Sequence, residues 1–157
     1  MHVPTKKEVA DFFDVRRALE TASTRLAAER ATPEQARELQ EVLDQGREML
    51  AHGDDPSKAD GRVHLHAMIA RIADNPLLEK MLANIRRRAD WYSPPFDPVM
   101  RRQSWEQHTE IVAAIAAHDV ECATDLMRQH IDGSRDHLYA SLSGEEPTTQ
   151  TVAVAGQ

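Results

Sequence analysis

The sequence predicts an all-α protein. Glycine is scarce, at 6 of 157 residues, while the strong helix formers alanine, leucine, glutamate and arginine recur along the chain. No stretch alternates β-branched or aromatic residues with polar ones over the length of a strand. Hydrophobic residues make up 41% and charged residues 29%, which is the balance of an ordinary globular domain with a sizeable core. We therefore expect one helical domain.

Two capping boxes mark the first two helices. Thr5-Lys-Lys-Glu8 begins a helix that we expect to reach about Ala31, and Thr32-Pro-Glu-Gln35 begins one that ends near Gly53. In a capping box the first and fourth side chains each accept a hydrogen bond from the backbone of the other residue, which satisfies free N–H groups. Both sequences are therefore typical of helix starts.

The first helix carries apolar residues that predict its buried face. They are Phe12, Leu19 and Leu26, with Val15 and Ala22 between them. A seven-residue repeat of this kind is typical of a helix that packs in a bundle. Arg16 lies next to this stripe and has two interpretations: a surface arginine whose stem covers apolar residues, or an anion-binding group at the wall of a pocket.

The later helix starts are marked by an Asp or Asn, in most cases followed by Pro. They are Asp55-Pro56, Asn75-Pro76, Asp97-Pro98 and Asp119. These side chains cap a helix, and Pro is tolerated in its first turn. The segment from Asp55 to about Ala73 contains Gly61, which can divide it into a short and a longer piece. The domain is expected to span residues 1–142, and residues 143–157, without helical period, are expected to form a disordered tail.

Charge and cysteine content exclude several classes of protein. A net charge of −7 argues against a general nucleic-acid binder, because phosphate contacts need a basic surface. The single cysteine, Cys122, cannot form an internal disulfide. No apolar run approaches the length of a membrane span, and no signal peptide is recognisable. We expect a cytoplasmic protein that does not associate with membranes.

Two histidines lie on the apolar stripes of two helices joined by a tight turn. The stripes consist of His108, Ile111, Val112 and Ile115, and of Ala123, Leu126, Met127 and His130. Both histidines are roughly 15–16 Å from the turn at a helical rise of about 1.5 Å per residue, so they reach one level of an antiparallel pair. Two inward imidazoles at one level are what a buried metal site needs. The alternative is a pair of core histidines with satisfied hydrogen bonds.

A third ligand can come from the neighbouring helix. Asp60 and His64 lie one turn apart on one helical face, while His66 points elsewhere. With a third inward histidine, the site would have three or four nitrogen and oxygen ligands and no thiolate. Such a site suits Zn²⁺, or another divalent metal such as Ni²⁺ or Mn²⁺, and leaves an open coordination position.

Three stretches together resemble a known family. They are DFFDVRRALETASTRLAAERATPEQARELQEVL, HLHAMIARIADNPLLEKML and EQHTEIVAAIAAHDVECATDLMRQHI. They are similar to the C-terminal effector-binding domain, called FCD, of GntR-type bacterial transcription regulators of the FadR-like subgroup. The resemblance runs from about Ala10 to His137 in the family's order.

The resemblance implies an antiparallel bundle of six to seven helices around a central pocket. The pocket of this family usually holds a divalent metal, and a small carboxylic acid binds there as effector. Two of the family's histidine ligands map onto His108 and His130. The inward arginine of its first helix maps onto Arg16, in a role that suits the bidentate guanidinium group. A homodimer is also implied.

The family's first pair of ligands, an Asp and a His one turn apart, does not map cleanly. Counting back from Asn75 without a gap places the His at His66 and puts Arg62 where the Asp would be, whereas the family's spacing selects Asp60 and His64. The apolar residues after His66 favour the ungapped register, with metal ligands His66, His108 and His130. The pair Asp60 and His64 remains the alternative.

Three functions remain after these observations. The first is the ligand-sensing domain of a regulator, in which DNA would be bound only through a winged helix-turn-helix domain that is absent from this chain, either truncated or naturally missing. It would not be an enzyme. The second is a metal-dependent enzyme acting on a small carboxylate or ester, with Asp60 as the candidate base. The third is a helical interaction module whose histidines belong to the core.

Overall fold

The structure is a computed structural model that describes residues 4–54, 61–89 and 98–143, and within helix α3 no side chain before Leu65 is described. These ranges contain six α-helices and no strand. The helices are α1 (Lys6–Arg30), α2 (Pro33–Ala51), α3 (Gly61–Ile72), α4 (Pro76–Ala89), α5 (Pro98–Ala116) and α6 (Val120–Ser143). The predicted all-α bundle is therefore confirmed.

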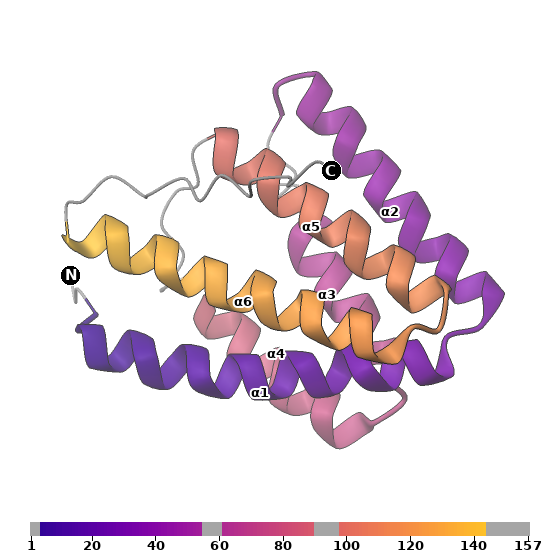
Figure 1. The fold of residues 1–157 in the computed structure, drawn as a ribbon, viewed down its shortest axis with the longest axis horizontal. Coiled ribbons are helices and arrows are strands. Elements are labelled where there is room, and N and C mark those ends of the chain that lie inside the picture. The colour runs from indigo at the N-terminus through magenta and orange to yellow at the C-terminus, as the bar shows by residue number, and fades with distance from the viewer. Residues whose placement is uncertain (1–3, 55–60, 90–97, 144–157) are drawn as a thin grey trace, which may run out of the picture.

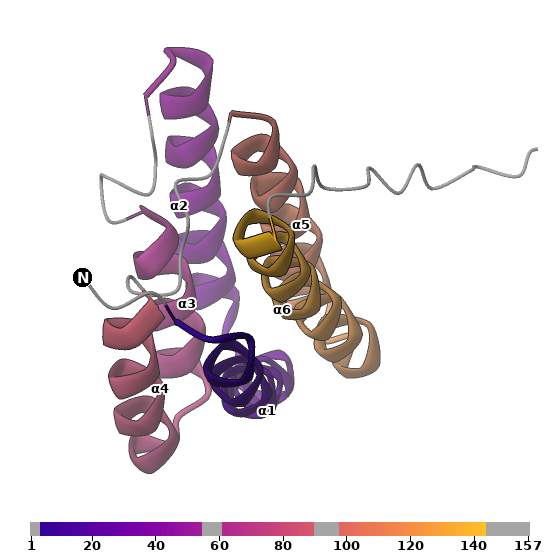
Figure 2. The same ribbon diagram turned by 90° about the vertical axis from the view of Figure 1, so that its left-hand side faces the viewer.

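The long helix α1 connects the two sides of the bundle. It runs antiparallel to α6 along most of its length (Figure 1) and also contacts α3, α4 and α5. The view in Figure 2 places α3 and α4 on one side of α1, and α5 and α6 on the other. A group on the inner face of α1 can therefore reach residues from both sides.

The predicted caps form. Thr5 and Thr32 each complete a capping box, with Glu8 and Gln35 respectively. Asn75 accepts a hydrogen bond from a backbone N–H in the first turn of α4, and Asp119 does so for α6, both at 3.1 Å. The start expected at Asp55-Pro56 and the cap expected at Asp97 lie outside the described residues.

The turn between α5 and α6 is joined to α1 by a histidine. His118 adopts a left-handed backbone conformation, with φ of 54°, which is sparsely populated by residues other than glycine. Its Nδ1 donates a hydrogen bond to the carbonyl of Ala28 at 2.8 Å. This bond fixes the α5–α6 hairpin against the C-terminal half of α1.

The inner face of α1 differs from the predicted stripe. Val15, expected to face the bundle, is 48% exposed, while the neighbouring Arg16 is 8% exposed. The residues buried along α1 are Val9, Phe12, Phe13, Arg16, Glu20, Ser23, Thr24, Leu26, Ala27 and Ala28. The buried face keeps Phe12 and Leu26 of the predicted stripe but excludes Val15. Polar residues, Arg16 and Glu20 among them, occupy the middle of this face.

A close approach of α2 and α5 depends on Gly46. The indole of Trp105 lies against this glycine, and a Cβ atom there would overlap the ring. The indole Nε1 donates a hydrogen bond to the carbonyl of Leu43 at 3.0 Å, so its one polar group is satisfied although the side chain is buried. The buried residues of the main apolar core come from α1, α2, α3, α5 and α6, and the half-buried Ile85 of α4 packs against them. Leu78 and Leu82 of α4 belong to a second cluster with Leu26 of α1.

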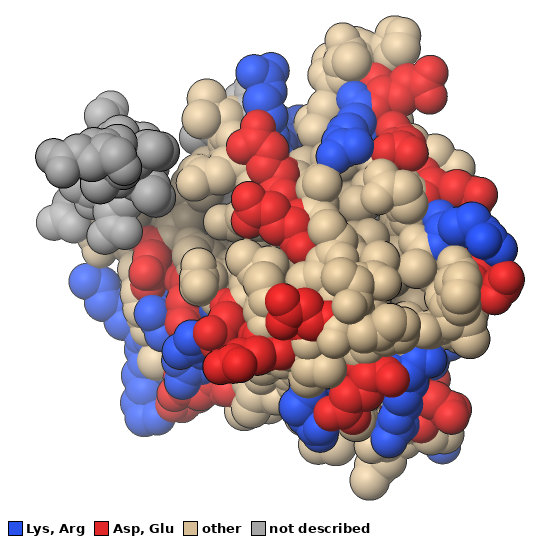
Figure 3. Space-filling view, turned by 45° about the vertical axis from the view of Figure 1, so that its right-hand side comes forward, with Lys and Arg blue, Asp and Glu red and all other residues tan. Residues whose placement is uncertain are grey.

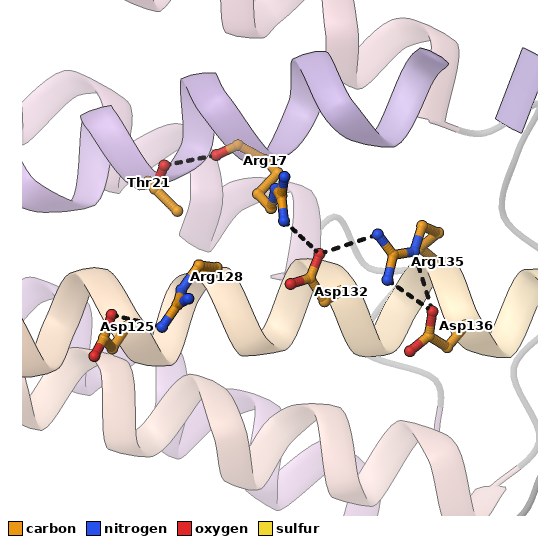
Figure 4. A network of polar contacts seen from close by, with 7 residues as sticks. All are labelled: Arg17, Thr21, Asp125, Arg128, Asp132, Arg135 and Asp136. Atoms are coloured by element: carbon orange, nitrogen blue, oxygen red, sulfur yellow. Dashed lines mark hydrogen bonds and ion pairs between the residues drawn. The ribbon is translucent and has the colours of Figure 1, made fainter. Parts of the chain in front are cut away.

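The described surface carries both acidic and basic side chains. On the face in Figure 3, acidic and basic side chains are interspersed rather than gathered into one basic field. Between α1 and α6, Asp132 lies 3.5 Å from both Arg17 and Arg135, and Arg135 also pairs with Asp136 (Figure 4). None of the described helices is long and apolar enough to cross a membrane.

Candidate functional site

Three buried histidines from three helices meet inside the bundle. His66 of α3, His108 of α5 and His130 of α6 are at most 3% exposed. The Nε2 atom of His108 lies 3.2 Å from that of His66 and 3.1 Å from that of His130. One ring nitrogen from each residue falls within 4.8 Å of the others, and the group could hold a metal ion.

Helical spacing accounts for two of the three positions. His108 and His130 face one another because each lies on the inner stripe of its helix at an equal distance from the turn, as the spacing predicts. The structure brings His66 to them, in agreement with the ungapped register. Asp60 lies outside the described residues, as does the side chain of His64, so this alternative pair stays untested.

The contacts of the outer ring nitrogens set the direction of the lone pairs. His130 donates from Nδ1 to Oε1 of Gln107 at 2.8 Å, and the Nδ1 atom of His66 lies 3.2 Å from Oε2 of Glu20. A neutral imidazole with its proton on Nδ1 has a bare lone pair on Nε2. The Nε2 atom of His130 therefore directs a lone pair toward His108, and the Nε2 atom of His66 does the same when its Nδ1 carries the proton.

The three histidine nitrogens are better suited to binding a cation than to contacting only one another in a metal-free core. The Nε2 atom of His108 can carry one proton and so can donate to only one of its two neighbours, and the other contact then joins two lone pairs. The observed 3.1 and 3.2 Å separations are close to the edge of a zinc tetrahedron, which is roughly 3.3 Å for bonds of about 2.05 Å. The three donors therefore suit a divalent metal ion.

A buried charged group adjoins the histidines. Arg16 and Glu20 lie one turn apart on the inner face of α1, and the Arg16 guanidinium lies 5.7 Å from the centroid of the Phe13 ring. On α4, Nη1 of Arg86 makes a long contact of 3.4 Å with the carbonyl of His66. Two arginines and one glutamate thus occupy the space beside His66.

Burial and mutual attraction act in opposite directions on these charges. Burial lowers the pKa of Arg16, and the nearby Glu20 carboxylate partly opposes this effect. Burial on its own raises the pKa of Glu20, but His66, Arg16 and Arg86 together outweigh it and hold that pKa below its usual value. The carboxylate is therefore the charged partner of a mainly basic group.

Two buried hydroxyl groups add to the polar surroundings. Ser23 follows Glu20 by three residues on α1, and Ser104 precedes His108 by one turn on α5. Neither hydroxyl oxygen finds a hydrogen-bond partner among the described residues. Buried polar atoms are normally satisfied, so such oxygens are suited to a polar ligand or water.

A surface cavity between α2 and α5 is separate from the histidines. It measures about 490 Å³, and Arg47, Arg102, Trp105 and Glu106 line it. The Trp105 ring also contacts His108 edge to face, with centroids 5.5 Å apart. This indole therefore lies between the cavity and the histidine cluster.

Sequence reasoning missed several of these groups. Glu20 had one usable signal, since it follows Arg16 by four residues and so shares its face. Gln107, Ser23 and Ser104 had none, because each is an ordinary polar residue whose role depends on packing. Arg16, for which a surface position was one interpretation, is buried beside the site.

Comparison with protein families identifies this helical domain. Residues 11–133 match the FCD domain model. The chain belongs to the FCD domain family, which confirms the resemblance seen in the sequence.

Two known proteins resemble the chain. The HTH-type transcriptional repressor NanR of Cronobacter sakazakii (strain ATCC BAA-894) is 29% identical over 131 residues, which cover 79% of this chain. The chain spans about half the length of that protein, 48%. The solved structure of E. coli McbR/YncC superposes with a TM-score of 0.77 at 22% identity, over 88% of this chain and 67% of that one, and so shares the fold.

Proposed function

We propose that this chain is the ligand-sensing domain of a GntR-type transcription regulator, and that a small carboxylic acid is its effector. The acid would bind at or beside a divalent metal held by His66, His108 and His130. Membership of the FCD family and the likeness to a transcriptional repressor support the regulatory role. The observation that carries the binding site is the convergence of three Nε2 atoms, with Arg16 buried one turn from the Glu20 that contacts His66.

Zn²⁺ is our first choice of metal, with Ni²⁺ and Mn²⁺ as alternatives. Three imidazoles without a thiolate suit all three ions, and zinc sites with three protein ligands keep an open position. When bound, the metal would supply a Lewis-acidic position that a carboxylate oxygen can occupy. The chain's own groups would then decide which acids bind.

Arg16 and Arg86 are the groups that would favour an anion. Arg16 is buried and Arg86 half-buried, and among the described residues Glu20 is the acidic side chain that interacts with both. With a divalent metal, positive charges would exceed negative ones in a space shielded from water. Guanidinium groups bind carboxylates in a planar bidentate manner, so we assign the effector's carboxylate to Arg16.

The same helix would carry the signal. In a regulator of this type the DNA-binding domain connects to the N-terminal side of the sensing domain, which is the side where α1 begins. Arg16 lies on α1, so an effector held by Arg16 acts directly on the helix that leads to that domain. A shift between two arrangements of α1 in a cytoplasmic homodimer would reposition the DNA-binding domains. The proposal assigns no catalytic step to the site.

Metal analysis and ligand screening test this proposal together. Elemental mass spectrometry of the purified protein should find near-stoichiometric metal, and a chelator should lower the melting temperature. Metal-loaded protein should then melt at a higher temperature with some members of a panel of small organic acids, because a ligand that binds only the folded state stabilises it. A protein indifferent to chelator, added Zn²⁺ and every acid would refute the proposal.

A further inference from the structure

We propose that Glu20 is a positioning residue for the metal centre: it holds His66 in the tautomer whose Nε2 lone pair faces the other two histidines, and it supplies a negative charge close to the cation. This inference rests on the metal site of the proposed function. The sequence alone does not indicate a contact between Glu20 and His66, because the two residues are 46 positions apart.

The two side chains contact each other in isolation from water. Oε2 of Glu20, on α1, lies 3.2 Å from Nδ1 of His66, on α3, with side-chain exposures of 0% and 4%. The distance is within hydrogen-bond range, although the N–H direction is not fully aligned. Among the described residues, no contact of either Glu20 carboxylate oxygen or of His66 Nδ1 meets full hydrogen-bond geometry. Each group is therefore the partner that the other needs.

A carboxylate at this position selects one tautomer of His66. With the proton on Nδ1, the ring presents N–H to the carboxylate and a lone pair to His108. With the proton on Nε2, a lone pair would face the charged carboxylate, and the N–H would point at the Nε2 atom of His108, 3.2 Å away. The first arrangement is favoured electrostatically, and it leaves the ligand atom ready for a metal.

His130 provides an internal comparison. Its Nδ1 donates to the amide oxygen of Gln107 at 2.8 Å, which orients that ring with a neutral acceptor. Glu20 differs from Gln107 because it carries a negative charge. Three neutral imidazoles have no negative charge with which to balance a divalent ion, so this carboxylate would supply it. A carboxylate behind a metal-bound histidine also makes that ligand more basic, and loss of such a partner typically weakens metal binding by about 10- to 100-fold.

The test compares two variants of Glu20 in the full chain. Glu20→Gln keeps an oxygen acceptor and nearly the same volume but removes the charge, whereas Glu20→Ala removes both. We measure Zn²⁺ affinity by competition with a chromophoric chelator. The expected losses are about 10-fold for Glu20→Gln and nearer 100-fold for Glu20→Ala. The matched control is Glu29→Gln, on the same helix, whose carboxylate is exposed and pairs with Arg25; its affinity should equal that of the wild type.

A second measurement reads the tautomer directly, without metal. Long-range ¹H–¹⁵N correlation spectra of the metal-free protein should show His66 protonated on Nδ1 in the wild type and in Glu20→Gln, and a mixture of tautomers in Glu20→Ala. A merely structural glutamate would not change this spectrum. Wild-type affinity in both variants, or an Nε2-protonated His66 in the wild type, would overturn the inference.

The two proposals fail in different ways. If the wild type binds no Zn²⁺, the proposed function is refuted, and with it the role of Glu20 toward a metal. If the wild type binds Zn²⁺ and both Glu20 variants bind it equally well, only the inference is refuted. Melting curves establish that each variant is folded, and the near-isosteric Glu20→Gln carries the test if Glu20→Ala does not fold.

Discussion

The Nε2 atoms of His108 and His130 lie 3.1 Å apart, although the residues belong to different helices and are 22 positions apart in the chain. The hairpin of α5 and α6 creates this proximity, since both residues occupy the inner stripe at the same height above the turn. Because two imidazoles this close cannot both direct a lone pair at the other without repulsion, the hairpin has a built-in requirement for a proton or a metal between them.

Replacement of one of these histidines should abolish the response to metal. In the wild type, Zn²⁺ at about 100 times its dissociation constant should add about 2.7 kcal/mol of stability, or roughly 5–10 °C in melting temperature for a domain of this size. His108→Ala should show almost no Zn²⁺-dependent rise, measured by differential scanning fluorimetry. The control His52→Ala alters an exposed histidine at the end of α2 and should respond like the wild type. An undiminished response in His108→Ala would contradict the assignment.

The fold could be predicted largely from local signals. The capping boxes at Thr5 and Thr32 and the caps at Asn75 and Asp119 form hydrogen bonds within one turn of the chain, so the sequence carries the whole interaction. The equal spacing of His108 and His130 from one tight turn is likewise local. It required only the assumption of an antiparallel hairpin, and the structure confirms that geometry.

The remainder of the site depends on contacts between distant segments. The apolar heptad of α1 predicts a buried face that includes Val15 and leaves Glu20 out. However, α1 packs on both sides, against α6 and against α3 and α4, so its buried surface is wide and includes Arg16 and Glu20. A stripe argument assumes one partner and polar residues outside. The contact between Glu20 and His66 cannot be predicted from such a stripe, because it exists only once α1 and α3 have packed together.

Gly46→Ala should destabilise the protein despite the higher helix propensity of alanine. The added methyl group would overlap the Trp105 indole, which is fixed by its hydrogen bond to Leu43. Overpacking of this kind costs about 1–3 kcal/mol or more, which exceeds the roughly 1 kcal/mol gained by replacing glycine in a helix. Urea unfolding followed by circular dichroism would measure the difference.

Gly133→Ala is the matched control for that substitution. Gly133 also lies within a helix, α6, but a Cβ atom there would meet no neighbour within 4 Å. This variant should gain about 0.5–1 kcal/mol from helix propensity alone. If both variants shifted stability in the same direction, the close contact between Gly46 and Trp105 would not be the determining factor.

Asp132→Asn should weaken the contact between α1 and α6 by a small amount that depends on salt. Asp132 lies 3.5 Å from Arg17 across the two helices and 3.5 Å from Arg135 on its own helix, with all three side chains partly exposed (Figure 4). Ion pairs in such positions contribute at most about 1 kcal/mol, and less at high ionic strength. Asp125→Asn breaks a pair within α6 and serves as control. Melting curves at low and high salt should show a larger, salt-sensitive loss for Asp132→Asn.

Arg16→Gln should separate binding of an acid from binding of the metal. The guanidinium is buried on the inner face of α1, and we assign the effector's carboxylate to it, whereas the metal donors are histidines on other helices. The variant should retain near-stoichiometric metal but lose most of the acid-induced rise in melting temperature, since a charge-assisted bidentate contact is removed. Its folded state should also be less stable, because the buried Glu20 loses a cationic neighbour. Arg17→Gln removes the same charge from the adjacent position, where the side chain turns toward Asp132 instead, and should leave the response to acids unchanged. An equal loss of response in both variants would show that net charge, and not the buried guanidinium, governs acid binding.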